Sequence, residues 1–141
     1  MTETSLPARP PVRLPEAEKI TINLGYVDLG QIDLLVREGF FSNRTDFIRT
    51  AIRSQLDRHS AVVDKALTRK QLDLGISHFT RTSLEQLRAA GEMLEIRVLG
   101  LATFDADISG ELARATIRSL TVLGALHASA EVKAALADRM I

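Results

Sequence analysis

The chain has 141 residues, with 18 basic and 18 acidic side chains and no cysteine. A formal net charge of zero argues against strong non-specific binding to polyanions, although it leaves room for a local basic face. The absence of cysteine excludes disulfides, thiolate metal sites and a cysteine nucleophile. No apolar run is long enough for a transmembrane helix, and the N-terminus lacks the apolar core of a signal peptide. We therefore expect a cytoplasmic protein that does not bind membranes.

Residues 1–17 are expected to form a flexible arm. All four prolines of the chain lie at or before Pro15, and this stretch has no apolar periodicity. Arg9 and Arg13 could reach a phosphate or a minor groove, but a solvated tail is the simpler interpretation.

Residues 18–59 are expected to form a domain of one strand and two helices. Apolar and polar residues alternate over residues 19–24, which is typical of a half-buried strand. The apolar spacing then becomes helical, Gly39 ends the first helix, and Ser42 and Asn43 are capping residues for the second. The apolar residues at helical spacing are Val27, Leu29, Ile32, Leu35 and Val36, then Phe47, Ile48, Ala51, Ile52 and Leu56.

A single strand has no partner within this domain and is not stable alone in water. The simplest solution is antiparallel pairing with the same strand of a second chain about a two-fold axis. The apolar side chains of the strand would then lie on the helices, and its polar side chains would form an open face that fits the major groove of B-DNA. The expected dimer core consists of Ile20, Ile22, Leu24, Ile32, Leu35, Ile48 and Ile52.

Residues 19–59 resemble the ribbon-helix-helix fold of the Arc/MetJ/CopG superfamily of transcriptional regulators, and their second helix is similar to that of CopG-like and NikR-like members. The resemblance rests on KITINL, on the turn at Gly39 and on SNRTDFIRTAIRSQL. It implies a non-enzymatic, DNA-binding regulator, most simply a repressor, that acts on double-stranded DNA as a homodimer or a higher oligomer. It also implies no cofactor.

Lys19, Thr21 and Asn23 are the expected base-contacting residues. Lysine can donate to guanine, asparagine can bond adenine bidentately, and threonine offers a hydroxyl and a methyl group. The alternative is that they form only the solvated face of an antiparallel pair. The resemblance favours DNA contact, because this face contacts bases in the family.

Ser42, Asn43 and Arg44 are expected to contact DNA phosphates. The free N–H groups and the positive dipole end of a helix start form an anion site, and arginine adds a charge-assisted hydrogen bond. The alternative is a plain N-cap formed by Ser42 or Asn43, and both roles can hold together because they use different donors. At least one of Phe40 and Phe41, which lie in the turn, is expected to fill the core.

Residues 60–70 are expected to form a helical connector, which either continues the preceding helix with a bend near His59 or is a separate helix capped by Ser60. Residues 71–141 are expected to form a small domain of strand-helix repeats. The runs LDLG (72–75), RVLG (97–100) and TVLG (121–124) each precede a serine and a helical pattern. Such a period predicts parallel strands joined by helical crossovers, with glycines at close approaches. The whole chain is therefore of the α+β class. Its C-terminal domain either self-associates or simply extends the dimer.

No catalytic or metal-binding constellation is evident. His59, His78 and His127 lack close ligand spacing, and Asp105 and Asp107 are expected to lie in a loop with no histidine nearby. A turn and helix-start role is expected for the two aspartates.

Two alternatives to a regulator remain open at the level of sequence. One is an antitoxin, although the toxin-binding segment of such proteins is usually short and unfolded when free. The other is a scaffold protein that assembles through its repeats and is anchored on DNA.

Overall fold

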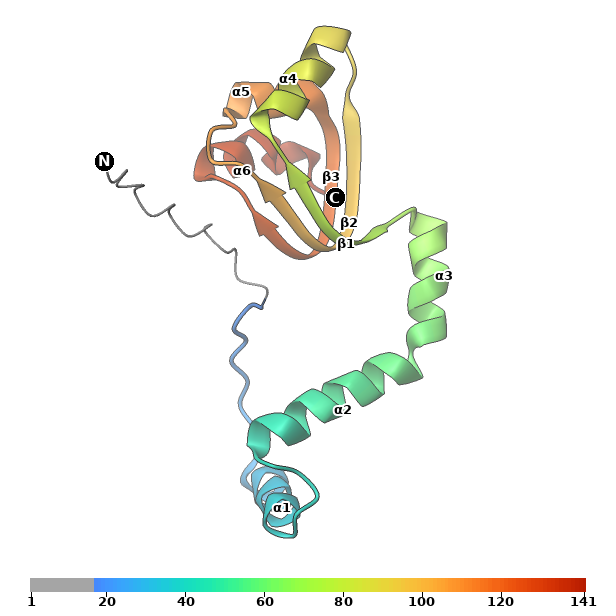
Figure 1. Ribbon diagram of the computed structural model, residues 1–141, viewed down its shortest axis with the longest axis vertical. Helices are drawn as coiled ribbons and strands as arrows, with labels where there is room; N and C mark the ends of the chain where they lie inside the picture. The colour runs from blue at the N-terminus through green and yellow to red at the C-terminus, as the bar shows by residue number, and fades with distance from the viewer. Residues whose placement is uncertain (1–16) are drawn as a thin grey trace, which may run out of the picture.

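The computed structural model describes residues 17–141 and divides them into a helical N-terminal part and a C-terminal α/β part (Figure 1). The predicted arm, apart from Ala17, lies outside the described residues. The helical part contains α1 (Tyr26–Arg37), α2 (Arg44–Arg58) and α3 (Ser60–Lys70). The α/β part contains β1 (Asp73–Phe79), α4 (Arg81–Ala90), β2 (Leu94–Phe104), α5 (Gly110–Thr116), β3 (Ile117–His127), α6 (Ala130–Leu136) and the 3₁₀ turn η1 (Ala137–Arg139).

Residues 19–24, which the sequence predicts to be a strand, have neither strand nor helix structure and lead directly into α1. A strand is defined by hydrogen bonds to a neighbouring strand, and the described part of this single chain offers none to this segment. Gly25, at its end, is extended, with φ −65° and ψ 151°. Pairing with a second chain therefore stays a prediction.

The turn between α1 and α2 is built around Gly39, as the sequence predicts. Gly39 has a φ of +86°, in the left-handed region that favours glycine. Its N–H donates to the carbonyl oxygen of Val36 at 3.1 Å, and that of Phe40 donates to Leu35 at 3.0 Å. These bonds satisfy the last carbonyl groups of α1.

One of the two phenylalanines in this turn packs, and the other does not. Phe41 lies edge-on against Phe47 of α2, with ring centroids 5.0 Å apart. Phe40 is 72% exposed. Phe41 is half-buried in the single chain, so its expected place in a closed core stays a prediction.

The helical run breaks for one residue, at His59, between α2 and α3. The Nδ1 atom of His59 lies 2.9 Å from the carbonyl oxygen of Gln55, so its side chain is bonded to the last turn of α2. Helix α3 ends at Lys70, and its C-cap residue Gln71 has a φ of +52°. The break gives the chain a sharp change of direction before the sheet (Figure 1).

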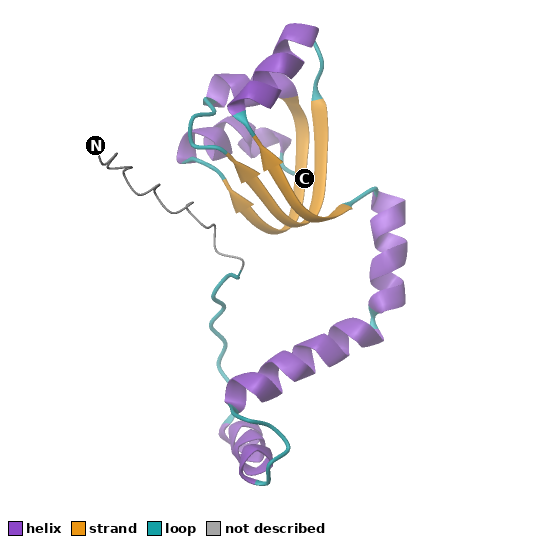
Figure 2. Ribbon diagram, in the orientation of Figure 1, coloured by secondary structure: helices purple, strands orange, loops and turns teal. Residues whose placement is uncertain are grey.

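The sheet has three strands in the order β1-β2-β3, and both pairings are parallel. Consecutive parallel strands need a crossover, and α4 and α5 supply the two crossovers. The sheet curves, with its concave side towards α4, α5 and α6 and its convex side away from them (Figure 2). The expected parallel strands are thus confirmed.

A row of glycines crosses the sheet. Gly75, Gly100 and Gly124 are paired in register and have φ values of +127°, +140° and +122°. A Cβ on Gly100 would lie 2.1 Å from the carbonyl oxygen of Gly75, and a Cβ on Gly124 would lie 2.0 Å from that of Gly100. Both the backbone conformation and the close approach require glycine here.

The core lies between the concave face of the sheet and the helices. Its buried residues are Leu84, Ile96, Val98, Ala102, Phe104, Ile108, Leu112, Ala113, Ile117, Leu120, Val132 and Leu136. Ser109 and Ser129 cap α5 and α6 through their side chains, whereas α4 is capped by Thr80 in a reciprocal capping box with Ser83.

Candidate nucleic-acid interface

The segment before α1 carries the expected base-contacting residues. Lys19, Thr21 and Asn23 are all exposed. The apolar residues between them are exposed as well in the single chain: Ile20 by 80%, Ile22 by 63% and Leu24 by 41%. Exposed apolar side chains in a row are unfavourable in water and mark surfaces that become covered.

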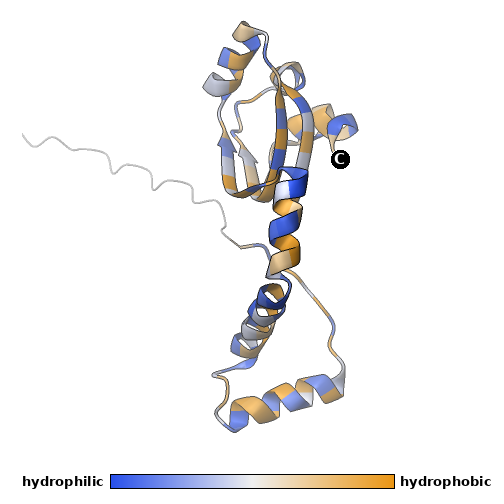
Figure 3. Cartoon of the chain, turned by 90° about the vertical axis from the view of Figure 1, so that its right-hand side faces the viewer, coloured by the Kyte–Doolittle hydropathy of each residue, from blue (hydrophilic) through white to orange (hydrophobic). Residues whose placement is uncertain are grey.

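The apolar faces of the helices that follow are only partly covered. Ile32 is buried, at 6% exposure, while Leu35 and Ile48 are half-buried. Helix α2 has no buried residue, and Ile52 and Leu56 on its apolar face are 54% and 60% exposed. Figure 3 shows hydrophobic bands along α1 and α3. The helical part of a single chain therefore leaves much of its expected core open to water.

The start of α2 is shaped by a hydrogen-bonded cap. Asn43 is the N-cap residue, and its side chain accepts a hydrogen bond from the N–H of Asp46 at 2.8 Å. The Asp46 carboxylate in turn accepts from the N–H of Ser42 at 2.9 Å. The first intrahelical bond runs from Phe47 to Asn43, so helix geometry leaves the N–H groups of residues 44 and 45 free of intrahelical partners.

Arg44 joins this helix start to α1. Its Nε and Nη2 atoms each donate to the carboxylate of Asp33 at 2.8 Å, which is the bidentate geometry of an arginine–carboxylate pair. The hydrogen bond from Arg44 holds the pKa of Asp33 below its usual value, and the same pair raises the pKa of Arg44. The pair leaves no periodic signal in the sequence, because its members are separated by 11 residues across a turn.

The C-terminal part brings together one pair that the sequence analysis excluded. The Nε2 atom of His78 lies 2.5 Å from Oδ1 of Asp105, and both side chains are partly exposed. The expectation that Asp105 has no histidine nearby is therefore wrong. The strands β1 and β2 are adjacent and parallel, with His78 opposite Thr103, so their carboxyl ends meet. Within residues 17–141, no three histidine or acidic side chains cluster as a metal site would require.

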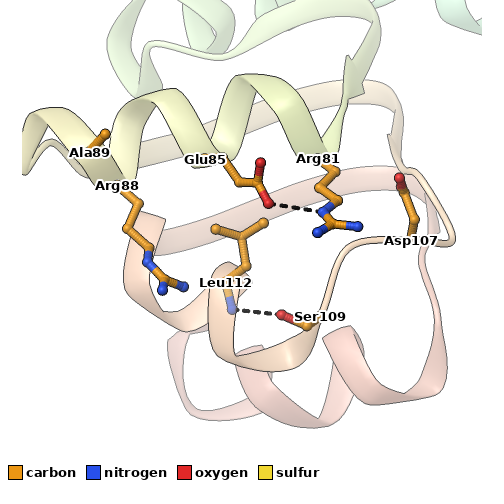
Figure 4. Close-up of a pocket in the computed structure, with 7 residues that line it drawn as sticks. All are labelled: Arg81, Glu85, Arg88, Ala89, Asp107, Ser109 and Leu112. Atoms are coloured by element: carbon orange, nitrogen blue, oxygen red, sulfur yellow. Dashed lines mark hydrogen bonds and ion pairs between the residues drawn. The ribbon is translucent and has the colours of Figure 1, made fainter.

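A hollow of about 620 Å³ lies between α4 and α5 (Figure 4). Its polar side chains largely bond within the protein, since Arg81 donates to Glu85 at 2.9 Å and Ser109 accepts from the N–H of Leu112 at 3.1 Å. Neither the Arg81–Glu85 pair nor the Ser109 cap places a nucleophilic side chain next to a general base. In the part of the chain that the structure describes, no helix is both long and apolar enough to cross a membrane.

The segment before α1, the two helices joined at Gly39 and the capped start of α2 form a helical module that is followed by a parallel sheet. The model of the ribbon-helix-helix transcriptional regulator family matches residues 15–133. The chain belongs to this family, whose members regulate transcription by binding DNA and are not generally enzymes. The match runs through the sheet to α6, so the C-terminal part is included in the family pattern.

One curated relative is an uncharacterized protein of Methanocaldococcus jannaschii. It is 35% identical to this chain over 54 residues, which are 38% of this chain and 54% of the relative. The chain thus spans about half the length of the curated relative it matches. No solved structure matches the chain significantly.

Proposed function

We propose that two copies of the chain pair through residues 19–24 to form an antiparallel ribbon that enters the major groove of DNA. Lys19, Thr21 and Asn23 of each copy contact base edges. The observation that carries this proposal is the alternation of exposed polar and exposed apolar side chains over residues 19–24. When such strands pair about a two-fold axis, their apolar side chains are covered by the helices, and their polar side chains stay free to contact DNA.

The dimer core of this assembly is formed by the apolar residues that a single chain leaves exposed or half-buried. They are Ile20, Ile22, Leu24, Leu35, Ile48 and Ile52, arranged around the buried Ile32. Burying an exposed isoleucine or leucine side chain contributes about 1.5–3 kcal/mol. The association of the two copies therefore has an ample apolar driving force.

The start of α2 clamps the DNA backbone through Ser42, Asn43 and Arg44. The free N–H groups of the first turn point towards an anion placed on the helix axis, and the helix dipole favours negative charge there. Arg44 uses two of its nitrogens on Asp33, and the guanidinium keeps further N–H donors for a phosphate oxygen. The pair with Asp33 fixes the direction in which these donors point.

A repressor is the simplest form of this regulator, since a dimer or a dimer of dimers on repeated half-sites occludes the DNA that it covers. The antitoxin alternative is weaker, because residues 73–136 pack a buried core of their own instead of forming a tail that folds on a toxin. The scaffold alternative depends on association through the sheet.

The test is binding to DNA from the promoter of the protein's own gene, measured by fluorescence anisotropy at fixed salt. The double variant Thr21→Ala, Asn23→Ala is expected to bind the specific site at least about tenfold more weakly, since a good base contact is worth about 1–3 kcal/mol. Binding to unrelated DNA should change little. The double variant Thr82→Ala, Gln86→Ala, on the exposed face of α4, serves as the control. Unaltered specific binding by the ribbon variant would falsify the assignment of the base-contacting face.

A further inference from the structure

The two outer edges of the sheet differ. The edge of β3 is covered at its amino end, because Leu120 forms a parallel bridge with Met140 and the N–H of Ile141 donates to the carbonyl oxygen of Leu120 at 3.0 Å. The guanidinium of Arg139 also donates to the carbonyl oxygen of Ile117, at 2.6 Å. Strand β1 pairs with β2 alone, and its other edge meets no strand among residues 17–141.

The backbone groups on the bare edge can be assigned. The carbonyl oxygen of Gly75 faces β2, since a Cβ on Gly100 would lie 2.1 Å from it. The carbonyl oxygen of Ser77 also faces β2, where it accepts a hydrogen bond from Thr103. Backbone groups of alternating residues point to opposite edges of a strand. The groups that point away from β2 therefore belong to Leu74, Ile76 and His78.

The side chains at this edge are the most exposed apolar groups of the convex face. Leu74 is 72% exposed and Ile76 is 70% exposed, whereas Leu99 and Leu101 beside them on β2 are half-buried. Natural edge strands are usually protected by lysine, by proline or by a covering segment. Strand β1 has no lysine and no proline, whereas residues 140 and 141 cover the amino end of the opposite edge.

We propose that β1 pairs antiparallel with β1 of a second copy of this chain, centred on Gly75, to give one continuous sheet. Leu74 then lies opposite Ile76 of the second copy, and the two residues exchange both backbone hydrogen bonds. Their side chains meet on the convex face as cross-strand apolar pairs, which are a stabilising unit of antiparallel sheets. The pairing covers the two side chains that the single chain leaves most exposed on this face.

The bend at Gly75 selects a second copy over an unrelated strand. With a φ of +127°, Gly75 departs from the extended backbone of a regular strand, as Gly100 and Gly124 do beside it on β2 and β3. A glycine of this kind marks a bend in a strand. A straight strand from another protein would lose alignment at this point. A two-fold axis through Gly75 and normal to the sheet places one bend opposite an identical bend, and every other register places a bend opposite a straight backbone.

This interface is separate from the ribbon of residues 19–24 and does not depend on DNA binding. Pairing of a short strand covers less than the roughly 800 Å² per partner of a standard interface. Pairing of the β1 edges is therefore a weak contact by itself. When the ribbon of residues 19–24 also joins chains, it raises the effective concentration of one β1 edge near another.

The first experiment tests the register by disulfide cross-linking, which is clean because the chain has no cysteine of its own. Full-length Leu74→Cys and Ile76→Cys chains, one of them marked by a tag, are co-expressed and mildly oxidised. We expect a cross-linked heterodimer to form at least about tenfold faster than in the matched pair Leu74→Cys with His78→Cys, whose residues lie at diagonal positions 7–8 Å apart or farther. Equal rates, or a faster reaction in the second pair, overturn the proposed register.

The second experiment measures mass against concentration in a full-length Ile22→Lys background, in which the ribbon cannot form. This chain should dimerise at high concentration. Addition of Ile76→Lys should raise the dissociation constant at least tenfold, whereas the matched change Leu123→Lys, at a 50% exposed position on β3, should not. A monomer at every concentration in the Ile22→Lys background overturns the proposal. An equal effect of the two added lysines also overturns it, because a face-to-face contact would then be responsible.

Discussion

Arg44 at the start of α2 holds Asp33 of α1 in a bidentate ion pair, with both donor–acceptor distances at 2.8 Å. The pair links the two helices at the point where the proposed phosphate clamp begins. Both side chains are about half exposed, at 55% and 49%, so the pair acts mainly by fixing geometry.

Replacing Arg44 by alanine removes one proposed phosphate contact. We expect weaker binding to specific and to unrelated DNA alike, and a slope of log K against log salt that is shallower by about 1. Anisotropy titrations over a salt series measure both effects. Arg53→Ala, an exposed position further along α2, is the control and should leave the slope unchanged. A loss limited to the specific site would instead assign Arg44 to base contact.

The pKa of Asp33 reports the same pair in solution. The hydrogen bond from Arg44 lowers this pKa in the folded protein from the ordinary value of 3.8. A lowered folded pKa means that the stabilisation is present above the unfolded pKa and is lost as pH falls through the folded value. In an NMR titration of the carboxyl group, Arg44→Ala should raise the pKa of Asp33. An unchanged value would show that the pair does not form in solution.

Two glycines allow a matched test of backbone strain. Gly100→Ala places a Cβ 2.1 Å from the carbonyl oxygen of Gly75 at a φ of +140°, and we expect it to destabilise the fold by at least about 2 kcal/mol. Gly30→Ala, inside α1 with open space around it, should instead stabilise the helix by about 0.5–1 kcal/mol. Urea unfolding measures both. Similar changes for the two variants would contradict the close approach at the glycine row.

Ile22 tests the proposed dimer core. The side chain is 63% exposed in the single chain, so Ile22→Lys should leave α1 and α2 folded while placing a charge where the ribbon packs on the helices. We expect unchanged circular dichroism and specific DNA binding at least tenfold weaker. Val62→Lys, at a 66% exposed position on α3, is the control. Full DNA binding by the Ile22 variant would exclude this ribbon.

The sequence predicted the local structure well where one residue decides it. Gly39 ends α1 because a left-handed residue is needed there, and Asn43 caps α2 through its side chain. The parallel strands also followed from the sequence, because similar runs ending in glycine recur along the chain and these glycines pair in register.

Contacts between residues far apart in the chain could not be predicted in this way. Asp33 and Arg44 meet across a turn, and His78 meets Asp105 because two parallel strands end at the same edge. Neither pair leaves a periodic signal in the sequence. The ribbon itself requires a second molecule, which the alternation over residues 19–24 implies but a single chain does not contain.

The glycine row also limits errors in folding. Similar runs such as RVLG and TVLG could pair one residue out of step during folding, since their apolar side chains are nearly interchangeable. A slipped alignment would put the left-handed glycine of one strand against a leucine of the next, where a Cβ stands in place of a hydrogen atom. The backbone conformation of the glycines, rather than the identity of the side chains, thereby selects the correct register of the strands.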